Sequence, residues 1–219
     1  LNVAAFNAAP LPVSVASILT EFENNEGLSG SAHSDVLRGN DDDAAGIAAA
    51  GALGSVLTNI ALVDGLQEFL DNAFGFSVAS FGSGNIILGG DGSDFIEGRG
   101  GNDIIDGDKW LNVRVSVRDA NNPSIEIDTV DRIADLMPRM LSGEINPSQL
   151  QIVREIKDGT TGAFNFDTAA FSGNADEYDI NIDDRGTADL SDDIVRVSDT
   201  VVGRDGVDRL TGIERLQFA

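Results

Sequence analysis

The chain lacks cysteine altogether and has a single histidine, His33. Without cysteine there are no disulfide bonds, zinc–thiolate sites or iron–sulfur clusters. With one histidine there is no H-E-x-x-H motif, which excludes the zinc protease arrangement built on it. Disulfide bonds and cysteine-ligated metal sites therefore do not stabilise this fold.

Basic residues are also scarce: 14 Lys and Arg stand against 37 Asp and Glu, for a formal net charge of -23. Such a surface repels nucleic acid and anionic membranes, so we expect no nucleic acid partner and no membrane insertion. A hydrophobic fraction of 42% argues against a disordered acidic tail. We expect a folded protein in which bound cations hold the like charges together.

Glycine, in contrast, is plentiful, with 25 residues, and part of it follows a nine-residue period. Residues 89–106 contain two copies of this period, and a third copy begins directly after them. Each copy opens with a glycine-rich turn, has Asp at its sixth position (Asp94, Asp103) and Ile at its eighth (Ile96, Ile105). This G-G-x-G-x-D-x-U-x pattern is typical of calcium-binding parallel β-helix repeats.

The pattern has a chemical reason. Glycines let a turn expose several carbonyl oxygens toward one point, and the Asp adds a charged oxygen, which together suit a hard cation. The short strands between turns should bury the eighth-position aliphatic residue. The sequence therefore predicts several calcium ions. Their candidate ligands are turn glycines and acidic or amide residues, namely Asp35, Asn85, Gly89, Gly90, Asp91, Gly92, Asp94, Gly98, Gly100, Asp103 and Asp108.

Two other interpretations of the glycines are weaker. A phosphate-binding loop needs a preceding strand, a following helix and a G-x-x-x-x-G-K-[ST] match, and Lys109 lies outside any such match. A plain Gly/Asp linker would not keep glycine, Asp and an aliphatic residue in a nine-residue register. The calcium interpretation accounts for all three.

An earlier copy of the period occupies residues 30–38, and the next copy is interrupted between residues 39 and 88 by a helical insertion at about 43–80. Because turns in such a roll alternate between two sides, each ion should lie between turns two repeats apart. Asp35 should then face Asp94 on one side, and Asn85 should face Asp103 on the other. The further ligands expected here are Asp41 or Asp43 beside Asn85, and Asp108 sharing an ion with Asp94.

Apolar spacing predicts helices at 11–24 and from Ile60 to Leu70, and the second of these should cover an open face of the roll. Residues 44–63 carry no charge, which raises the question of a membrane span. Their glycines, hydroxyl residues and acidic flanks make this stretch only weakly apolar, so packed soluble helices are the better interpretation.

The second half of the chain alternates strands and turns, with one helix at about 129–141 that Asp128 or Thr129 should cap. Asp208, Leu210 and Gly212 repeat the Asp-x-aliphatic-x-Gly spacing and suggest further stacking. A second calcium group or solvated turns would explain the Asp residues of this half equally well: Asp183, Asp184, Asp189, Asp192, Asp193 and Asp199.

The fold class expected from these patterns is mainly β with helical insertions (α+β). A short, split parallel β-roll with an N-terminal helix should occupy residues 1–108. A β-rich domain should follow over 109–219, either separate from the roll or packed with it as one unit.

The chain resembles a known family at several places. Residues 84–108 with Trp110-Leu-Asn-Val-Arg, Met140-Leu-Ser-Gly-Glu-Ile-Asn-Pro, and Gly212-Ile-Glu-Arg-Leu-Gln-Phe are similar to the RTX calcium-binding region of large secreted bacterial haem-peroxidase/RTX proteins, which are adhesin-like. The resemblance implies type I secretion, folding on external calcium, and a place outside the cell or on its surface. It also implies that the chain is a piece of a longer polypeptide, which supports adhesion or extension and meets a surface glycan or protein ligand.

Catalysis is not expected in this segment. Haem peroxidase chemistry commonly uses two histidines, so any peroxidase domain would lie elsewhere in the parent protein. A serine hydrolase would need Ser77 as its nucleophile and His33 as its base. Ser77 lies in an imperfect nucleophile-elbow sequence, so hydrolysis is not expected. A calcium-dependent sugar or peptide module is the alternative function, with Trp110 and Tyr178 available for stacking.

Overall fold

The computed structural model describes residues 27–50, 56–160, 165–187 and 193–219. Most of its regular structure is β-strand, in parallel and mixed sheets, which confirms the expected β-rich class. The α-helices in these ranges are short: α2 (Ala44–Ala50), α3 (Leu66–Phe74) and α4 (Met137–Leu141). The helix expected at 11–24 lies outside the described residues.

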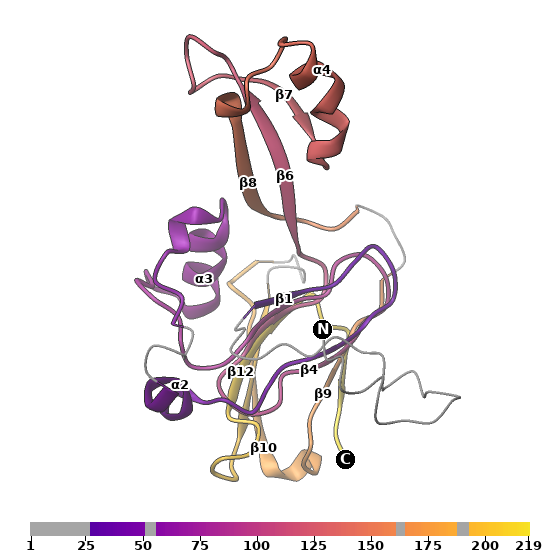
Figure 1. Cartoon of the computed structure of the whole chain (residues 1–219). Coiled ribbons are helices and arrows are strands. Elements are labelled where there is room, and N and C mark those ends of the chain that lie inside the picture. The colour runs from indigo at the N-terminus through magenta and orange to yellow at the C-terminus, as the bar shows by residue number, and fades with distance from the viewer. Residues whose placement is uncertain (1–26, 51–55, 161–164, 188–192) are drawn as a thin grey trace, which may run out of the picture.

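Short parallel strands stack in two sheets, and successive strands of the chain alternate between them (Figure 1). The first sheet contains β1 (Gly27–Ser29), β3 (Ile86–Leu88), β5 (Ile104–Asp106) and β12 (Val207–Thr211), all parallel. The second sheet contains β2 (Val36–Arg38), β4 (Phe95–Glu97), β9 (Thr168–Ala170) and β13 (Arg215–Gln217), also parallel.

The main core lies between these two sheets. Side chains alternate between the two faces of a sheet, so the middle residue of a three-residue strand points to the face opposite that of its two neighbours. Leu37, Ile87, Ile96 and Ile105 occupy that position and pack in one buried cluster with Leu210. The expected burial of the eighth-position aliphatic residue is therefore confirmed, and each fully buried side chain contributes roughly 1.5–3 kcal/mol.

A first excursion leaves the sheets between β2 and β3 and contains α2, the 3₁₀ turn η3 (Ile60–Leu62) and α3. Leu66, Phe69 and Leu70 of α3 are buried against the outward-facing Ile86 and Ile104 of the first sheet. The helical insertion thus covers one face of the strands, as predicted. The continuous helix expected from Ile60 is instead divided, because the extended Val63 ends η3 and Gly65, with a left-handed φ of 82°, stands before α3 as its N-cap.

The second excursion, between β5 and β9, forms an antiparallel sheet of its own (Figure 1). Its long strands β6 (Trp110–Arg118) and β8 (Leu150–Lys157) pair along their length, and β7 (Glu126–Val130) pairs with the other edge of β6. The 3₁₀ turns η4 (Ile133–Leu136) and η5 (Pro147–Gln149) flank α4.

The helix predicted for 129–141 begins later than expected. Asp128 and Thr129 lie in β7, where Thr129 pairs with Ser116 and Asp128 with Val117. The Asp128 carboxylate bonds Arg139 instead of capping a helix. Long-range strand pairing therefore overrides a local capping signal at these two residues.

The third excursion, between β9 and β12, contains η6 (Ala175–Glu177) and the antiparallel pair β10 (Tyr178–Asp183) and β11 (Ile194–Asp199). β11 pairs with β12 and so extends the first sheet. Each of the two stacked sheets combines strands from both sides of the boundary expected at residue 108, whereas the sheet of β6, β7 and β8 lies wholly after it. Among the described helices, none has the length and apolar character needed to cross a membrane.

Candidate metal centre

Acidic and amide residues stand directly before the paired stretches of the stacked strands, in two rows. The first row precedes the strands of the second sheet and consists of Asp35, Asp94, Asp167 and Glu214. The second row precedes the paired stretches of the first sheet and consists of Asn85, Asp103 and Asp208. Successive turns on one side of the stack thus each bring one such side chain.

Hydrogen bonds connect neighbours within the first row. The Asp35 amide donates to Asp94 Oδ1 at 2.7 Å, and the Asp94 amide donates to Asp167 Oδ1 at 2.6 Å. The Asp167 amide in turn donates to Glu214 Oε2 at 2.6 Å. Asp35 and Asp94 therefore lie side by side, 59 residues apart in the sequence.

The second row repeats this arrangement. The Asn85 amide donates to Asp103 Oδ1 at 2.6 Å, and the Asp103 amide donates to Asp208 Oδ1 at 2.8 Å. The Asn40 amide donates to Asn85 Oδ1 at 2.9 Å, so Asn40 holds the place that we expected Asp41 or Asp43 to fill. Asp43 instead accepts the Gly46 amide at the start of α2.

The second carboxylate oxygen of three of these residues is buried and has no hydrogen-bond partner among the described residues. Asp94 is 2% exposed, and Asp103 and Asp167 are both 0% exposed. In the described part of the chain, Oδ2 of each accepts no hydrogen bond. Because an unsatisfied buried carboxylate oxygen is costly, a ligand is the expected partner at these places.

Main-chain carbonyl oxygens lie beside two of these unsatisfied atoms, Asp94 Oδ2 and Asp167 Oδ2. A Cβ atom at Gly89 would overlap both the Gly107 carbonyl oxygen and Asp94 Oδ2. A Cβ atom at Gly98 would overlap Asp103 Oδ2. The absence of a side chain at the first glycine thus lets a carboxylate oxygen approach at Gly98, and a carboxylate and a carbonyl oxygen together at Gly89. Such oxygens are the ligands that calcium takes.

Burial changes the protonation of these carboxyl groups. Loss of solvent raises the pKa of Asp103 to about 8 and that of Asp167 to about 7. Burial also raises the pKa of Asp94, and it raises the pKa of Asp208 well above its usual value. The nearby charge of Asp94 adds to the shift at Asp167, and that of Asp103 adds to the shift at Asp208. A cation at these oxygens would supply the charge that favours the ionised form.

Other predicted ligand residues have structural contacts of their own. Asp91 accepts hydrogen bonds from the amide and hydroxyl groups of Thr160. Gly90, Gly92 and Gly100 pack closely on the backbone of the turn below, and Gly90 and Gly92 do so with left-handed φ values of 96° and 127°. These glycines allow the turns to stack. Asp108 accepts a hydrogen bond from Asn165 and lies against Gly212.

The sequence did not identify Asp167, Asp208 or Glu214 as ligand candidates. The spacing of Asp208, Leu210 and Gly212 predicts further stacking of strands but does not mark Asp208 as a ligand. Asp167 follows a turn whose first half, Gly107 and Asp108, lies before the second excursion, so the nine-residue register is lost there. The signal that remains is short: an acidic residue directly before a small three-residue strand.

Of the six Asp residues suggested as a second calcium group, the four that the structure describes form no metal-binding cluster. Asp199 forms an ion pair with Arg204, and Asp183 lies near Arg185. Asp189 and Asp192 lie outside the described residues. Across the described ranges, no cluster of three or more His, Asp or Glu side chains forms a metal-binding group. A cation at the two rows would therefore need main-chain carbonyls as well as carboxylates.

The residues considered for catalysis or for stacking on a ligand lie in exposed turns and loops, at a strand end, or in the core. His33 is exposed in a turn, and Ser77 is exposed in the loop after α3. Trp110 is 36% exposed at the start of β6, whereas Tyr178 is buried against Phe171. The Tyr178 hydroxyl donates to Asp205, so its ring is not available to stack on a ligand.

Replacing Gly89 by Ala is expected to lower the melting temperature strongly. The added Cβ would meet a backbone carbonyl, which cannot move without shifting a neighbouring turn, at a cost of about 1–3 kcal/mol or more. Gly27→Ala is the matched control, because nothing lies within 4 Å of its Cβ position. Thermal unfolding followed by circular dichroism measures both; equal melting temperatures would contradict the role given to Gly89.

Comparison of the chain with protein-family models, curated proteins and solved structures finds no match. The chemistry of the two rows therefore has to be argued from their own residues.

Proposed function

We propose that this protein is a calcium-binding structural module. In it the two sheets form a split parallel β-roll, closed by calcium ions between stacked turns. The observation that carries the proposal is the pair of buried carboxylate oxygens, Asp94 Oδ2 and Asp103 Oδ2, which accept no hydrogen bond from the described residues. Each belongs to an intact nine-residue repeat, and each lies over the first glycine of its own turn.

The available donors favour calcium over other metals. They are carboxylate, amide and carbonyl oxygens, with no thiolate anywhere in the chain and with its one histidine exposed in a turn. Calcium accepts six to eight oxygens in a flexible geometry, whereas Mg²⁺ demands a near-ideal octahedron and gives up its water reluctantly. Irregular rows of carbonyls and single carboxylates suit the larger ion better.

Calcium at these turns would link parts of the chain that are far apart in the sequence. The first row connects Asp35 to Asp94 across 59 residues, and the second connects Asp103 to Asp208 across 105. Ions at such points stabilise the folded state because the unfolded chain does not form the sites. The module would therefore fold when calcium is supplied and then act as a rigid element.

The resemblance to RTX regions gives this behaviour a setting. A chain exported unfolded from a bacterial cell by type I secretion would meet high calcium outside and fold there. As part of a larger adhesin-like protein, the module would extend or support neighbouring parts of the polypeptide. It would do so without catalysing a reaction.

Calorimetric titration tests the proposal. At pH 7 calcium should bind with clearly higher affinity than Mg²⁺, and binding should release protons. The protons come from Asp103 and Asp167, whose pKa values of about 8 and about 7 keep them partly protonated until a cation arrives. Titrations in two buffers of different ionisation enthalpy measure that release. Absence of calcium binding, or equal affinity for Mg²⁺, would refute the proposal.

A further inference from the structure

We propose that a further calcium ion binds around Asp167, at the turn where the chain leaves β5 for the second excursion and returns to β9. This site rests on the proposed function, but it uses residues outside the nine-residue repeats. The oxygen atoms that would bind the ion are Asp167 Oδ2, Asp108 Oδ2, Asn165 Oδ1 and the Gly212 carbonyl oxygen.

Asp167 is the centre of the site. Its side chain is 0% exposed, and Oδ1 accepts the Asp94 amide at 2.6 Å. The other oxygen, Oδ2, is buried and receives no hydrogen bond from any described residue. A carboxylate with one oxygen fixed and the other unsatisfied is held ready for a cation.

The surroundings of Asp167 match those of Asp94 in the intact repeat. A Cβ atom at Gly107 would overlap Asp167 Oδ2 and the Gly212 carbonyl oxygen. In the same way, a Cβ atom at Gly89 would overlap Asp94 Oδ2 and the Gly107 carbonyl oxygen. The broken turn therefore rebuilds, from distant segments, the arrangement that the repeat makes locally.

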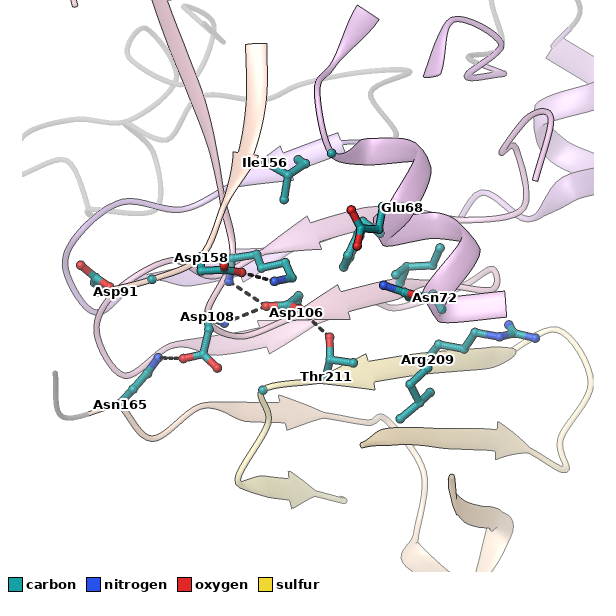
Figure 2. A pocket seen from close by; sticks show the side chains of 18 of the residues that line it. Glu68, Asn72, Asp91, Asp106, Asp108, Ile156, Asp158, Asn165, Arg209 and Thr211 are labelled. Carbon is teal, nitrogen blue, oxygen red and sulfur yellow. Dashed lines mark hydrogen bonds and ion pairs between the residues drawn. The ribbon is translucent and has the colours of Figure 1, made fainter. Parts of the chain in front are cut away.

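Asp108 and Asn165 add two more oxygens. The Asn165 amide donates to Asp108 Oδ1, as Figure 2 shows, and Asp108 Oδ2 lies over Gly212. Asn165 Oδ1 is itself buried and, like Asp167 Oδ2, has no hydrogen-bond partner among the described residues. A single cation bound to both Asp167 Oδ2 and Asn165 Oδ1 would satisfy these two buried oxygens.

Asp106 holds this arrangement in position. Its Oδ1 accepts the amides of Asp108 and Lys109, at 3.0 and 2.7 Å, and its Oδ2 accepts the Thr211 hydroxyl at 2.6 Å. These bonds, drawn in Figure 2, tie the start of the second excursion to β12. All acceptor oxygens of Asp106 are used, so it positions Asp108 without being a ligand.

Part of this site borders a cavity, whose lining includes Asp108 and Asn165 but not Asp167. The cavity, of about 880 Å³, is also lined by Gly212 and lies between α3, the first sheet and the base of the second excursion (Figure 2). Its lining holds five acidic residues, Glu68, Asp91, Asp106, Asp108 and Asp158, against three basic ones, Lys109, Arg185 and Arg209. Lys109 pairs with Asp158, but the remaining excess of acidic groups favours entry of a hydrated cation. The cavity also leaves room for water to complete the coordination.

Calcium here would join the two ends of the second excursion, since Asp108 and Asn165 are 57 residues apart in sequence. It would also connect β9 to the turn before β13 through Asp167 and Gly212. The C-terminal strands would then depend on calcium although they contain no complete repeat.

Asp167→Asn tests the site. The substitution keeps an oxygen for the Asp94 amide and removes the charge. Native mass spectrometry in calcium should show one ion fewer than in the unsubstituted protein, and hydrogen exchange should show loss of protection in β9. Asp179→Asn is the control, because Asp179 is an exposed residue of β10. An unchanged ion count and unchanged protection of β9 would overturn the inference.

A second variant guards against a general folding defect. Asp108→Asn removes one donor without touching the hydrogen bonds of the first row, and it should lower the ion count in the same way. If Asp94→Asn and Asp103→Asn reduce the ion count but neither Asp167→Asn nor Asp108→Asn does, this site alone is refuted. If the unsubstituted protein binds no calcium, the proposed function fails as well.

Discussion

Removing calcium is expected to lower the melting temperature by roughly 10–20 °C. Each site filled at about a hundredfold over its dissociation constant stabilises the folded state by about 2.7 kcal/mol. In a protein of this size, 1 kcal/mol shifts the melting temperature by about 2–4 °C, so two sites give the stated range. Thermal unfolding in excess calcium and in excess chelator measures the difference.

The effect should depend on pH in a defined direction. Folding raises the pKa of Asp103 to about 8 and that of Asp167 to about 7, above their usual value of 3.8. The folded, calcium-free protein therefore holds more protons than the unfolded chain between these limits. The stability that these two groups contribute is present at acidic pH and is lost as pH rises from about 4 to about 8.

Calcium should reverse that loss, because it binds the ionised form of the same groups. The gain in melting temperature on adding calcium is expected to be larger at pH 8 than at pH 5. Magnesium at equal concentration is the control for ionic strength and should produce a much smaller gain. A melting curve that chelator leaves unchanged at pH 8 would contradict a stabilising role for calcium.

The second large effect is expected from Asp94→Asn combined with Asp103→Asn. Asparagine retains an oxygen for the amides of Asp35 and Asn85, so the ladder hydrogen bonds remain possible. The buried negative charges disappear, and with them the main attraction for the ion. Most of the calcium-induced gain in melting temperature should be lost.

Without calcium, the same double variant should be at least as stable as the unsubstituted protein at pH 8. It no longer has to bury ionised or protonated carboxyl groups that lack partners. The control is Asp176→Asn with Asp179→Asn, which removes equal charge from exposed positions. If the control loses as much of the calcium response as the double variant, net charge and not the two rows is responsible.

The intact repeats could be recognised from the sequence because their information is local. Asp94 and Asp103 lie at fixed distances from glycines and aliphatic residues, so their turns, strands and buried side chains follow from one nine-residue register. The earlier copy with Asp35 was visible for the same reason. Its side-by-side position with Asp94 follows once turns alternate between two sides.

Positions that depend on long-range pairing could not be derived this way. Asp167 belongs to a turn whose halves are separated by the second excursion, so no window of sequence contains the pattern. Thr129 has a reasonable capping signal, yet pairing with Ser116 places it in a strand. Tyr178 could be taken for an exposed stacking residue, whereas its hydroxyl is used by the buried Asp205.

The interrupted stack also explains why the sequence pattern predicts a β-rich domain after residue 108, either separate from the roll or packed with it as one unit. The sequence after residue 108 alternates strand and turn patterns and contains a helix-capping signal, as an independent β-rich unit would. The strands β6, β7 and β8 do form their own sheet. The strands β9, β12 and β13 nevertheless complete the two stacked sheets. The short strands β9 and β13 have weak local signals, since they pair only with strands far away in the sequence, and β12 combines pairing to the neighbouring β11 with pairing to the distant β5.

Anomalous diffraction from crystals grown in calcium would locate the ions directly. Anomalous peaks are expected between the turns of the first row, beside Asp94, and between the turns of the second row, beside Asp103. Coordinating oxygens should lie at about 2.3–2.6 Å from each peak. Crystals that show no cation beside either carboxylate would contradict the claim that calcium joins these turns.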